Sequence, residues 1–232
     1  MNAKSRSNAL LNILKANGLL LDYDGLLVDT ESLYLATWCM VLDKEGQNIC
    51  ASSHRGRHES EVFELVKNHI NPMLKLRSLE QVSLYRKVMF HQLATKSGFV
   101  PMAGWLTFLV RFFEVKRMFV VSNSTLDAVN WGLETAGVKQ YFNGVIGFDG
   151  CGLRKPDPYL YNQAVQLLAI PRPEIVAFED SEAGLLAARA AGIYAICVSD
   201  NEGTWDFCSR MSIPFFRSAV ELLDGFRFAI KI

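Results

Sequence analysis

Residues 19–29 read LLLDYDGLLVD, and the rest of the fold can be worked out from this stretch. Its apolar run, Leu19–Leu21, ends at Asp22, and a second carboxylate, Asp24, follows two residues later. A short apolar run bounded by polar residues is typical of a strand buried in a parallel sheet. Ligands bind at the carboxyl ends of such strands, so Asp22 and Asp24 are the first candidate site residues. In an extended chain their side chains point the same way.

Four later apolar runs have the same character. They are Met118–Val121, Val145–Ile146, Ile175–Phe178 and Ala195–Val198. Helical patterns separate most of these runs. Because alternating strands and helices indicate a parallel sheet, we expect an α/β, Rossmann-like core with helices on both faces of the sheet.

The expected helices of this core begin at capping residues. Ser124 is a plausible N-cap, because Asp127 stands three residues later and apolar residues follow at helical spacing. Asp157-Pro158 predicts the start of another helix, with Pro158 in its first position. The alanine-rich stretch 181–191 predicts a third helix.

Residues 30–99 show helical periodicity without a convincing strand. Their regularly spaced apolar residues are Val62, Leu65, Val66 and Ile70, and then Leu79, Val82, Met89 and Leu93. We therefore expect a helical domain at 30–99, inserted into an α/β core made of residues 1–29 and 100–232. Pro101 and Gly104 mark the return to the core.

Composition limits the classes of function. The chain of 232 residues is 50% hydrophobic, enough for a large core. Its formal net charge of zero argues against a nucleic-acid partner. The five cysteines form no CxxC pair, so we expect reduced thiols in a cytoplasmic protein and no zinc site. No apolar run could span a membrane. We expect the basic segment 1–17 to be a short helix packed on the core, since secretory cleavage would fall almost at Asp22.

Polar residues at the other strand ends complete a chemically coherent set. They are Ser122, Asn123 and Ser124 after the second run, Lys155 before the helix that follows the third, and Glu179 and Asp180 after the fourth. Carboxylates bind Mg²⁺, a lysine adds a positive charge, and hydroxyls and amides donate to phosphoryl oxygens. The set therefore fits phosphoryl transfer. In this hypothesis Asp22 attacks phosphorus, while Asp24 protonates the leaving oxygen and then activates water.

Each of these residues also has an ordinary explanation. An aspartate after a strand is usually a turn or capping residue. Taken alone, Ser122 would be a cap, Lys155 a solvated lysine and Glu179-Asp180 a surface acidic pair. The functional interpretation rests on finding the required residue types at four strand ends together.

Four motifs occur in a fixed order along the chain. They are DYDGLLVDTE at 22–31, VVSNS at 120–124, GLRKPDPYLY at 152–161 and FEDSEAGLLAARAAG at 178–192. With these motifs the sequence resembles the haloacid dehalogenase superfamily, in the subgroup of β-phosphoglucomutase and the small-sugar phosphatases. The resemblance extends from Leu19 to about Val198.

The resemblance implies a role for each motif residue. Asp22 would be the nucleophile and Asp24 the general acid and base. Mg²⁺ would be held by the carboxylates of Asp22 and Asp180 and by the main-chain carbonyl of Asp24. Glu179 would either bind the ion directly or contact one of its ligands. Ser122 and Asn123 would bind the phosphoryl group, and Lys155 would balance its charge.

The helical insert resembles the subgroup's cap, which closes over the site and carries specificity. Gly56-Arg57 resembles a cap loop that meets the substrate, although Arg57 could equally be a surface arginine. Tyr34 stands where β-phosphoglucomutase has a histidine, and Glu59 where it has a cap arginine. Both differences favour a phosphatase over a mutase.

These arguments predict a magnesium-dependent phosphatase, a monomer or weak homo-oligomer, acting on a small phosphorylated metabolite such as a sugar phosphate. Two alternatives stay open: a phosphosugar mutase, and a catalytically idle protein that binds a phosphorylated ligand on the same fold. A phosphonate-cleaving enzyme is more distant, because it would need a lysine in the HRGRHES loop at 54–60.

Overall fold

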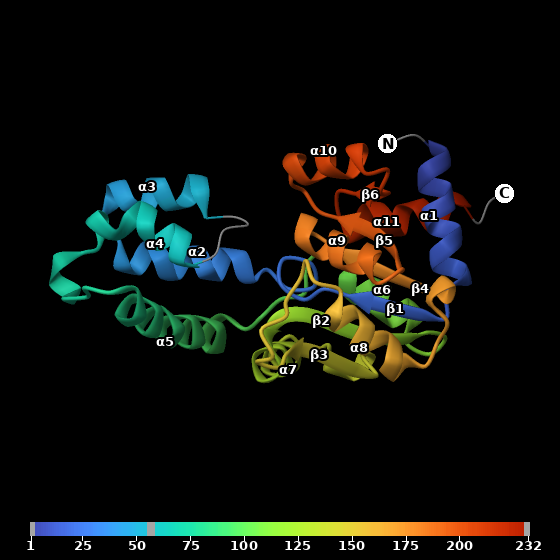
Figure 1. Cartoon of the computed structure of the whole chain (residues 1–232), viewed down its shortest axis with the longest axis horizontal. Coiled ribbons are helices and arrows are strands. Elements are labelled where there is room, and N and C mark those ends of the chain that lie inside the picture. Colours follow the sequence, from blue (N-terminus) through green and yellow to red (C-terminus); the bar gives the residue numbers. More distant parts are fainter. Residues whose placement is uncertain (1–2, 55–58, 230–232) are drawn as a thin grey trace. The chain divides into compact units, whose positions relative to one another are not determined.

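The computed structural model describes residues 3–54 and 59–229, and Figure 1 shows the course of the chain. The chain divides into two compact units, one made of Met1–Val28 and Val100–Ile232 and the other of Asp29–Phe99.

The first unit is built on a parallel sheet with the strand order β3-β2-β1-β4-β5-β6. The strands are β1 Gly18–Leu21, β2 Arg117–Thr125, β3 Gly144–Phe148, β4 Ile175–Glu179, β5 Tyr194–Val198 and β6 Phe215–Phe216. Each of the first five contains one of the five predicted apolar runs and extends beyond it. The sixth has only two residues and was not predicted.

Helices cover both faces of this sheet (Figure 1). On one face, α8 (Tyr159–Leu168), α9 (Glu182–Ala190) and α10 (Glu202–Arg210) share a core with the strands that includes Ala177. On the other face, Phe178 contacts Trp105 and Phe108 of α6 (Trp105–Phe112), with ring centroids 5.6 and 5.2 Å apart. Neighbouring strand residues point to opposite faces, which explains the different partners of Ala177 and Phe178. The predicted α/β, Rossmann-like fold is confirmed.

The N-terminal segment forms α1 (Ala3–Lys15), which packs on α11 (Ala219–Ala229). Leu10 and Ile13 of α1 are buried, as expected for a helix packed on the core. Lys116 Nζ donates to the carbonyls of Leu14 and Ala16, at 3.0 and 2.5 Å, and so caps the end of α1.

The second unit is helical in its described residues, with α2 Thr30–Val41, α3 Lys44–Ser53, α4 Glu59–Val66, α5 Leu79–Ser97 and short 3₁₀ turns at Lys67–His69 and Pro72–Leu74. Its core includes Trp38, Val62, Val66 and Val82. Leu65, which the sequence placed on the apolar face, is instead exposed.

A buried arginine joins the helices of this second unit. Arg86 of α5 stacks over the ring of Trp38, with 3.8 Å between the guanidinium carbon and the ring centroid. It also donates to Thr37 Oγ1 at 3.1 Å and to the carboxylate of Glu59. Ser83 Oγ donates to the same carboxylate at 2.8 Å. Glu59 is therefore a structural partner of Arg86.

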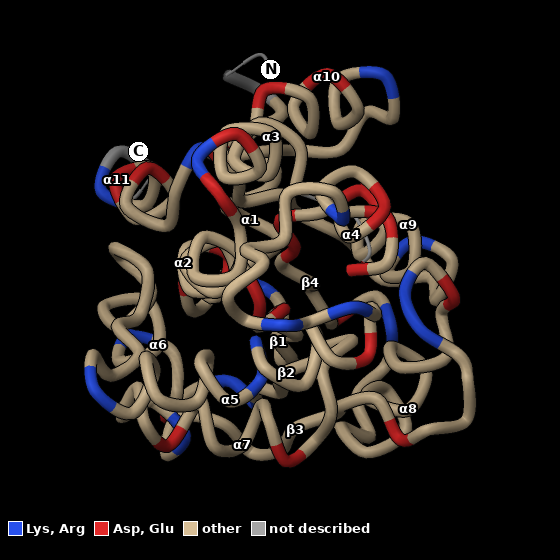
Figure 2. The backbone as a smooth tube through the Cα atoms, turned by 90° about the vertical axis from the view of Figure 1, so that its left-hand side faces the viewer, with Lys and Arg blue, Asp and Glu red and all other residues tan. Residues whose placement is uncertain are grey.

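Residues of opposite charge are interspersed in both units, in keeping with a net charge of zero (Figure 2). All five cysteines are free thiols. Within residues 3–54 and 59–229, every helix is too short or too polar to cross a membrane.

Candidate active site

The register of the sheet brings the predicted strand ends together. Leu21 of β1 pairs with Val120 of β2 and with Phe178 of β4. The next residues on the three parallel strands, Asp22, Val121 and Glu179, therefore lie beside one another at the carboxyl edge. The main-chain N–H of Asp22 donates to the carbonyl of Phe178 at 3.0 Å, which fixes the start of the loop that follows β1.

Lys155 lies at the centre of this edge. Its Nζ donates to Asp22 Oδ1 at 2.5 Å, to Glu179 Oε1 at 2.6 Å and to the carbonyl of Val121 at 2.6 Å. The three bonds use the whole donor capacity of an ammonium group. Lys155 is buried, so the alternative of a solvated lysine does not hold.

Asn123 holds the main chain of Lys155. Its Oδ1 accepts from the Lys155 N–H at 2.8 Å, and its Nδ2 donates to the Lys155 carbonyl at 3.2 Å. The sequence did not suggest this pairing. Both ends of the Asn123 side-chain amide are therefore engaged with the main chain of Lys155.

Three carboxylates form a candidate metal centre. Asp22, Glu179 and Asp180 each offer an oxygen, and these atoms lie within 4.8 Å of one another. Glu179 is fully buried, and its Oε2 has no hydrogen-bond partner among the described residues. The positive charge of Lys155, which contacts two of these carboxylates, does not neutralise all three, so the cluster keeps an excess of negative charge. An oxygen-only donor set with excess negative charge fits Mg²⁺.

Two glycines make room for these carboxylates. Gly25 has a φ of 78°, and a Cβ there would stand 2.4 Å from Asp180 Oδ2. A Cβ on Gly184 of α9 would stand 1.9 Å from Glu179 Oε2. A side chain at either position would therefore displace a carboxylate of the cluster, and at Gly25 the positive φ would add strain.

Burial raises the pKa of the Asp22 carboxyl well above its usual range. Lys155 opposes the rise, and the nearby carboxylates of Glu179, Asp180 and Asp24 add to it. Burial also acts to lower the pKa of Lys155, but the attraction of Asp22 and Glu179 outweighs it, so that pKa is raised. The lysine accordingly stays charged, and the edge favours a further positive charge.

Tyr161 of α8 is a partner that sequence reasoning missed. Its hydroxyl donates to Glu179 Oε1 at 2.5 Å, and Lys155 Nζ lies 5.3 Å from its ring centroid. Burial and the negative charge of Glu179 and Asp22 raise its pKa well above the usual range, so it stays a donor. Tyr161 is the last residue of the GLRKPDPYLY motif, and this position was the only hint in the sequence that it belongs to the site.

Asp24 receives two hydroxyl groups of β2. Ser122 Oγ donates to Asp24 Oδ2 at 3.1 Å, and Ser124 Oγ donates to the same oxygen at 2.7 Å. The prediction that Ser124 caps a helix is wrong: α7 (Leu126–Thr135) has Thr125 as its N-cap, without a side-chain bond. Ser124 still belongs to the strand, and a partner distant in sequence takes its hydroxyl.

The cap of α8 also differs by one residue from the prediction. Pro158 is the N-cap, and Tyr159 is the first helical residue. Asp157 Oδ1 accepts from the Tyr159 N–H at 2.8 Å. Arg57, the predicted substrate contact, lies outside the described residues.

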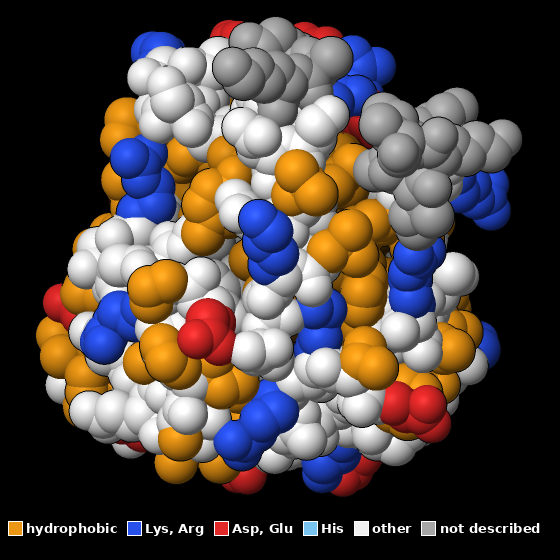
Figure 3. Space-filling model, turned by 90° about the vertical axis from the view of Figure 1, so that its right-hand side faces the viewer, with side chains coloured by type: hydrophobic (Ala, Val, Ile, Leu, Met, Phe, Trp, Pro, Cys, Tyr) orange, Lys and Arg blue, Asp and Glu red, His pale blue; other side chains and the backbone are white. Residues whose placement is uncertain are grey.

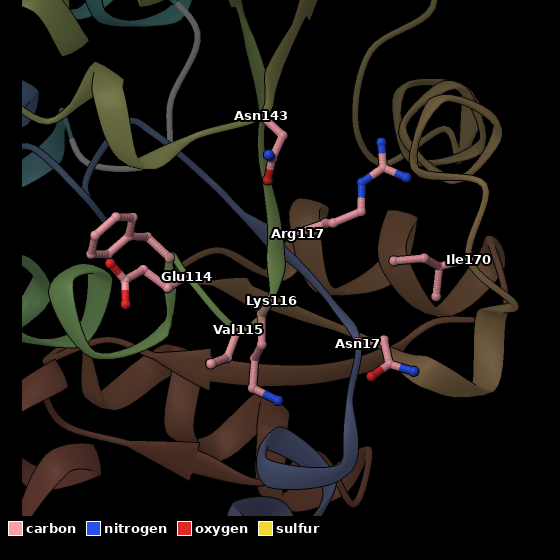
Figure 4. Close-up of a pocket in the computed structure, with 8 residues that line it drawn as sticks. Asn17, Glu114, Val115, Lys116, Arg117, Asn143 and Ile170 are labelled. Atoms are coloured by element: carbon pink, nitrogen blue, oxygen red, sulfur yellow. The ribbon is translucent and has the colours of Figure 1, made fainter.

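A cavity of about 460 Å³ lies at the opposite, amino edge of the sheet (Figure 4). Among its lining residues are Asn17, Lys116, Arg117 and Asn143, which stand at the starts of β1, β2 and β3. On that face basic and apolar side chains are interspersed (Figure 3). None of the predicted site residues that the structure describes lines this cavity, so it is separate from the carboxyl edge.

Comparison with protein families identifies the chain. Residues 16–192 match the model of the haloacid dehalogenase-like hydrolases. The chain belongs to this family.

Its relatives include several phosphatases. A phosphorylated carbohydrates phosphatase of Thermotoga maritima is 29% identical over 189 residues, which cover 78% of this chain and 86% of that protein. The fructose-1-phosphate phosphatase YqaB of Escherichia coli is 27% identical, covering 78% and 95%. With this family match, the chain is assigned as an enzyme, a phosphoric monoester hydrolase of the haloacid dehalogenase type.

Solved structures share the fold. A protein of Thermotoga maritima, provisionally assigned as a β-phosphoglucomutase, superposes with a TM-score of 0.71 at 21% identity, covering 91% of this chain and 98% of that one. CbbY of Rhodobacter sphaeroides in complex with phosphate gives 0.65 at 20% identity, covering 90% and 98%.

Proposed function

We propose that this hydrolase is a magnesium-dependent phosphatase that cleaves a small phosphorylated metabolite, with a sugar phosphate as its substrate class. The observation that carries the proposal is the buried Lys155 ammonium between Asp22 and Glu179, beside the three-carboxylate cluster. The sugar-phosphate class is supported by the two phosphatases named above, whose names specify phosphorylated carbohydrates and fructose 1-phosphate.

In the first proposed step a carboxylate oxygen of Asp22 attacks phosphorus, and the bond from phosphorus to the ester oxygen breaks. Asp24 gives its proton to that leaving oxygen, which departs as an alcohol. Lys155 balances the negative charge of the phosphoryl oxygens, and the Ser122 hydroxyl donates a hydrogen bond to one of them. The product is an aspartyl phosphate on Asp22.

In the second step Asp24, now a carboxylate, takes a proton from a water molecule that attacks the same phosphorus. The acyl phosphate bond breaks, inorganic phosphate leaves, and both aspartates return to their starting states. Asp22, Asp180, the main-chain carbonyl of Asp24 and, directly or through another ligand, Glu179 would hold Mg²⁺. Bound there, the ion would screen the repulsion between the carboxylates and the anionic phosphate.

The mutase alternative needs a cation for a second phosphate. Glu59 stands where β-phosphoglucomutase has an arginine, and the buried Arg86 is already bonded to Glu59 and stacked on Trp38. Tyr34 stacks on Phe90, with centroids 4.8 Å apart, where the mutase has a histidine. These contacts support the phosphatase proposal. The idle-protein alternative is disfavoured because Asp22 and Asp24 are both present.

We further propose that residues 30–99 are the cap that carries specificity, that Arg57 contacts the substrate, and that the protein is cytoplasmic, monomeric or weakly associated, and independent of nucleic acid. Arg57→Ala should lower kcat/KM for the preferred metabolite far more than for p-nitrophenyl phosphate, which offers a cap little to bind. Equal effects on both substrates would show that Arg57 is a surface arginine without a role in specificity.

A hydrolysis screen tests the function. The protein is incubated with a panel of phosphorylated metabolites and Mg²⁺, and released phosphate is measured with and without a chelator. We expect metal-dependent release from one or more sugar phosphates. Conversion of a hexose phosphate to an isomer, seen by phosphorus NMR without free phosphate, would select the mutase. If neither hydrolysis nor isomerisation is detected, the result would favour the catalytically idle protein.

A further inference from the structure

Ser124 has a hydroxyl that the sequence assigned to a helix cap and that the structure directs elsewhere. Its Oγ donates to Asp24 Oδ2 at 2.7 Å, across a sequence separation of 100 residues. Its main-chain N–H donates to Ser122 Oγ at 2.9 Å. Ser124 therefore contacts both the candidate acid and the candidate phosphate ligand.

The backbone of this segment is held tightly. A Cβ on Gly147 of β3 would stand 2.5 Å from the N of Leu126 and 2.9 Å from the carbonyl oxygen of Ser124. β3 thus packs directly against the main chain at 124–126. The main chain that carries Ser124 is therefore closely packed against β3, which restricts its movement.

Counting protons separates the roles of the two serines. A serine hydroxyl has one proton to donate. Ser122 donates its proton to Asp24 in this structure, and in the proposed reaction it donates to a phosphoryl oxygen. When a phosphate group occupies the site, Ser122 must release Asp24. Of the two hydroxyls, Ser124 alone then still holds that carboxyl group.

We propose that Ser124 is a positioning residue that holds Asp24 in place while its proton passes to the leaving group. The inference rests on the proposed function. By fixing Oδ2, Ser124 also fixes the orientation of Oδ1, the oxygen that would face the ester oxygen. A general acid acts only within hydrogen-bond reach of the atom it protonates, so loss of the tether should slow the step that needs the proton.

The test compares two leaving groups in single-turnover reactions with enzyme in excess. An alkyl phosphate, glycerol 3-phosphate or the metabolite found by the screen, needs protonation of its leaving oxygen. The p-nitrophenyl ester needs little. Ser124→Ala should slow alkyl ester cleavage about tenfold, the effect of one lost hydrogen bond, and p-nitrophenyl ester cleavage much less. The effect should fall on the limiting single-turnover rate constant and leave the half-saturating enzyme concentration unchanged.

Two further variants complete the experiment. Ser124→Thr keeps the hydroxyl and should restore the alkyl rate, whereas the similarly shaped Ser124→Val should not. This pair gives the same comparison if Ser124→Ala does not fold. Asp24→Asn supplies the reference pattern, with a larger loss of roughly 10²–10⁴-fold for the alkyl ester.

The outcomes separate two kinds of failure. An inactive wild-type enzyme would overturn the proposed function and this inference with it. An active wild type would overturn this inference alone if Ser124→Ala slows both esters equally, changes only the half-saturating enzyme concentration, or is not rescued by threonine.

Discussion

Two lysines, one buried and one partly buried, lie at opposite edges of the same sheet, and they differ in what they contact. Lys155, at the carboxyl edge, donates to the carboxylates of Asp22 and Glu179. Lys116, at the amino edge, donates to main-chain carbonyls at the end of α1. Burial acts to lower the pKa of each. The two carboxylates reverse this for Lys155, whose pKa is raised, while that of Lys116 is lowered.

The difference shows that partners, more than burial, decide whether a lysine holds its charge. At the carboxyl edge the protein confines charges that would be more stable in water, which is the usual cost of a reactive site. At the amino edge the same side chain completes a helix end. Substitutions at the carboxyl edge should therefore lower activity most, and substitutions at the amino edge should mainly lower stability.

The largest effect on activity is expected at Asp22. Asp22→Asn replaces the nucleophile with an amide, a poor nucleophile and a poor magnesium ligand, and should lower turnover on the order of 10⁴-fold. Phosphate release under saturating Mg²⁺ measures the loss, and circular dichroism checks the fold. If the variant keeps a substantial share of wild-type turnover, the aspartyl-phosphate mechanism is wrong.

The two lysines can be compared directly. Lys155→Met leaves Asp22 and Glu179 buried without their ammonium, so turnover should fall roughly 10²–10³-fold and the protein should be less stable. Lys116→Met should keep kcat within about twofold while lowering the melting temperature. Comparable losses of turnover in both variants would remove the distinction between the edges.

A smaller effect is expected at Asp180. Asp180→Ala removes one oxygen from the carboxylate cluster and should raise the Mg²⁺ concentration needed for half-maximal activity roughly 10–100-fold. Calorimetric titration with Mg²⁺ alone gives a second readout. Asp149→Ala, which alters a carboxylate outside the cluster, is the control. An unchanged magnesium titration for Asp180→Ala would exclude Asp180 as a ligand.

The smallest effect concerns pH and Lys116. Because its pKa is lowered by folding, the unfolded chain binds more protons than the folded one between the folded pKa and the ordinary value of 10.5. Stability from this group therefore rises with pH in that range. The melting-temperature advantage of wild type over Lys116→Met should grow from about pH 8 to about pH 10. A shrinking advantage would contradict the shift.

Much of the carboxyl edge could be predicted because its information is local. Each strand is an apolar run, and the residue after the run is at the edge by definition. The parallel register then aligns Asp22 with Glu179 without any further instruction. β6 escaped prediction because Phe215 and Phe216 are too short a run to distinguish from a loop.

The partners across the edge could not be predicted in the same way. Ser124 carries a capping pattern with Asp127, yet a carboxylate 100 residues away takes its hydroxyl. Asn123 next to it binds the peptide of Lys155. Local patterns describe what a side chain can do for its own segment, and tertiary contacts decide between that and a distant partner.

The position of β1 in the middle of the sheet has a consequence for synthesis on the ribosome. Gly18 pairs with Arg117 on one side and with Ile175 on the other, so both neighbours are translated long after β1. At usual elongation rates the apolar run Leu19–Leu21 waits roughly 5–30 s for them. The helical unit 29–99 is synthesised before either neighbour emerges, so it can fold first while the apolar residues of β1 still lack their strand partners.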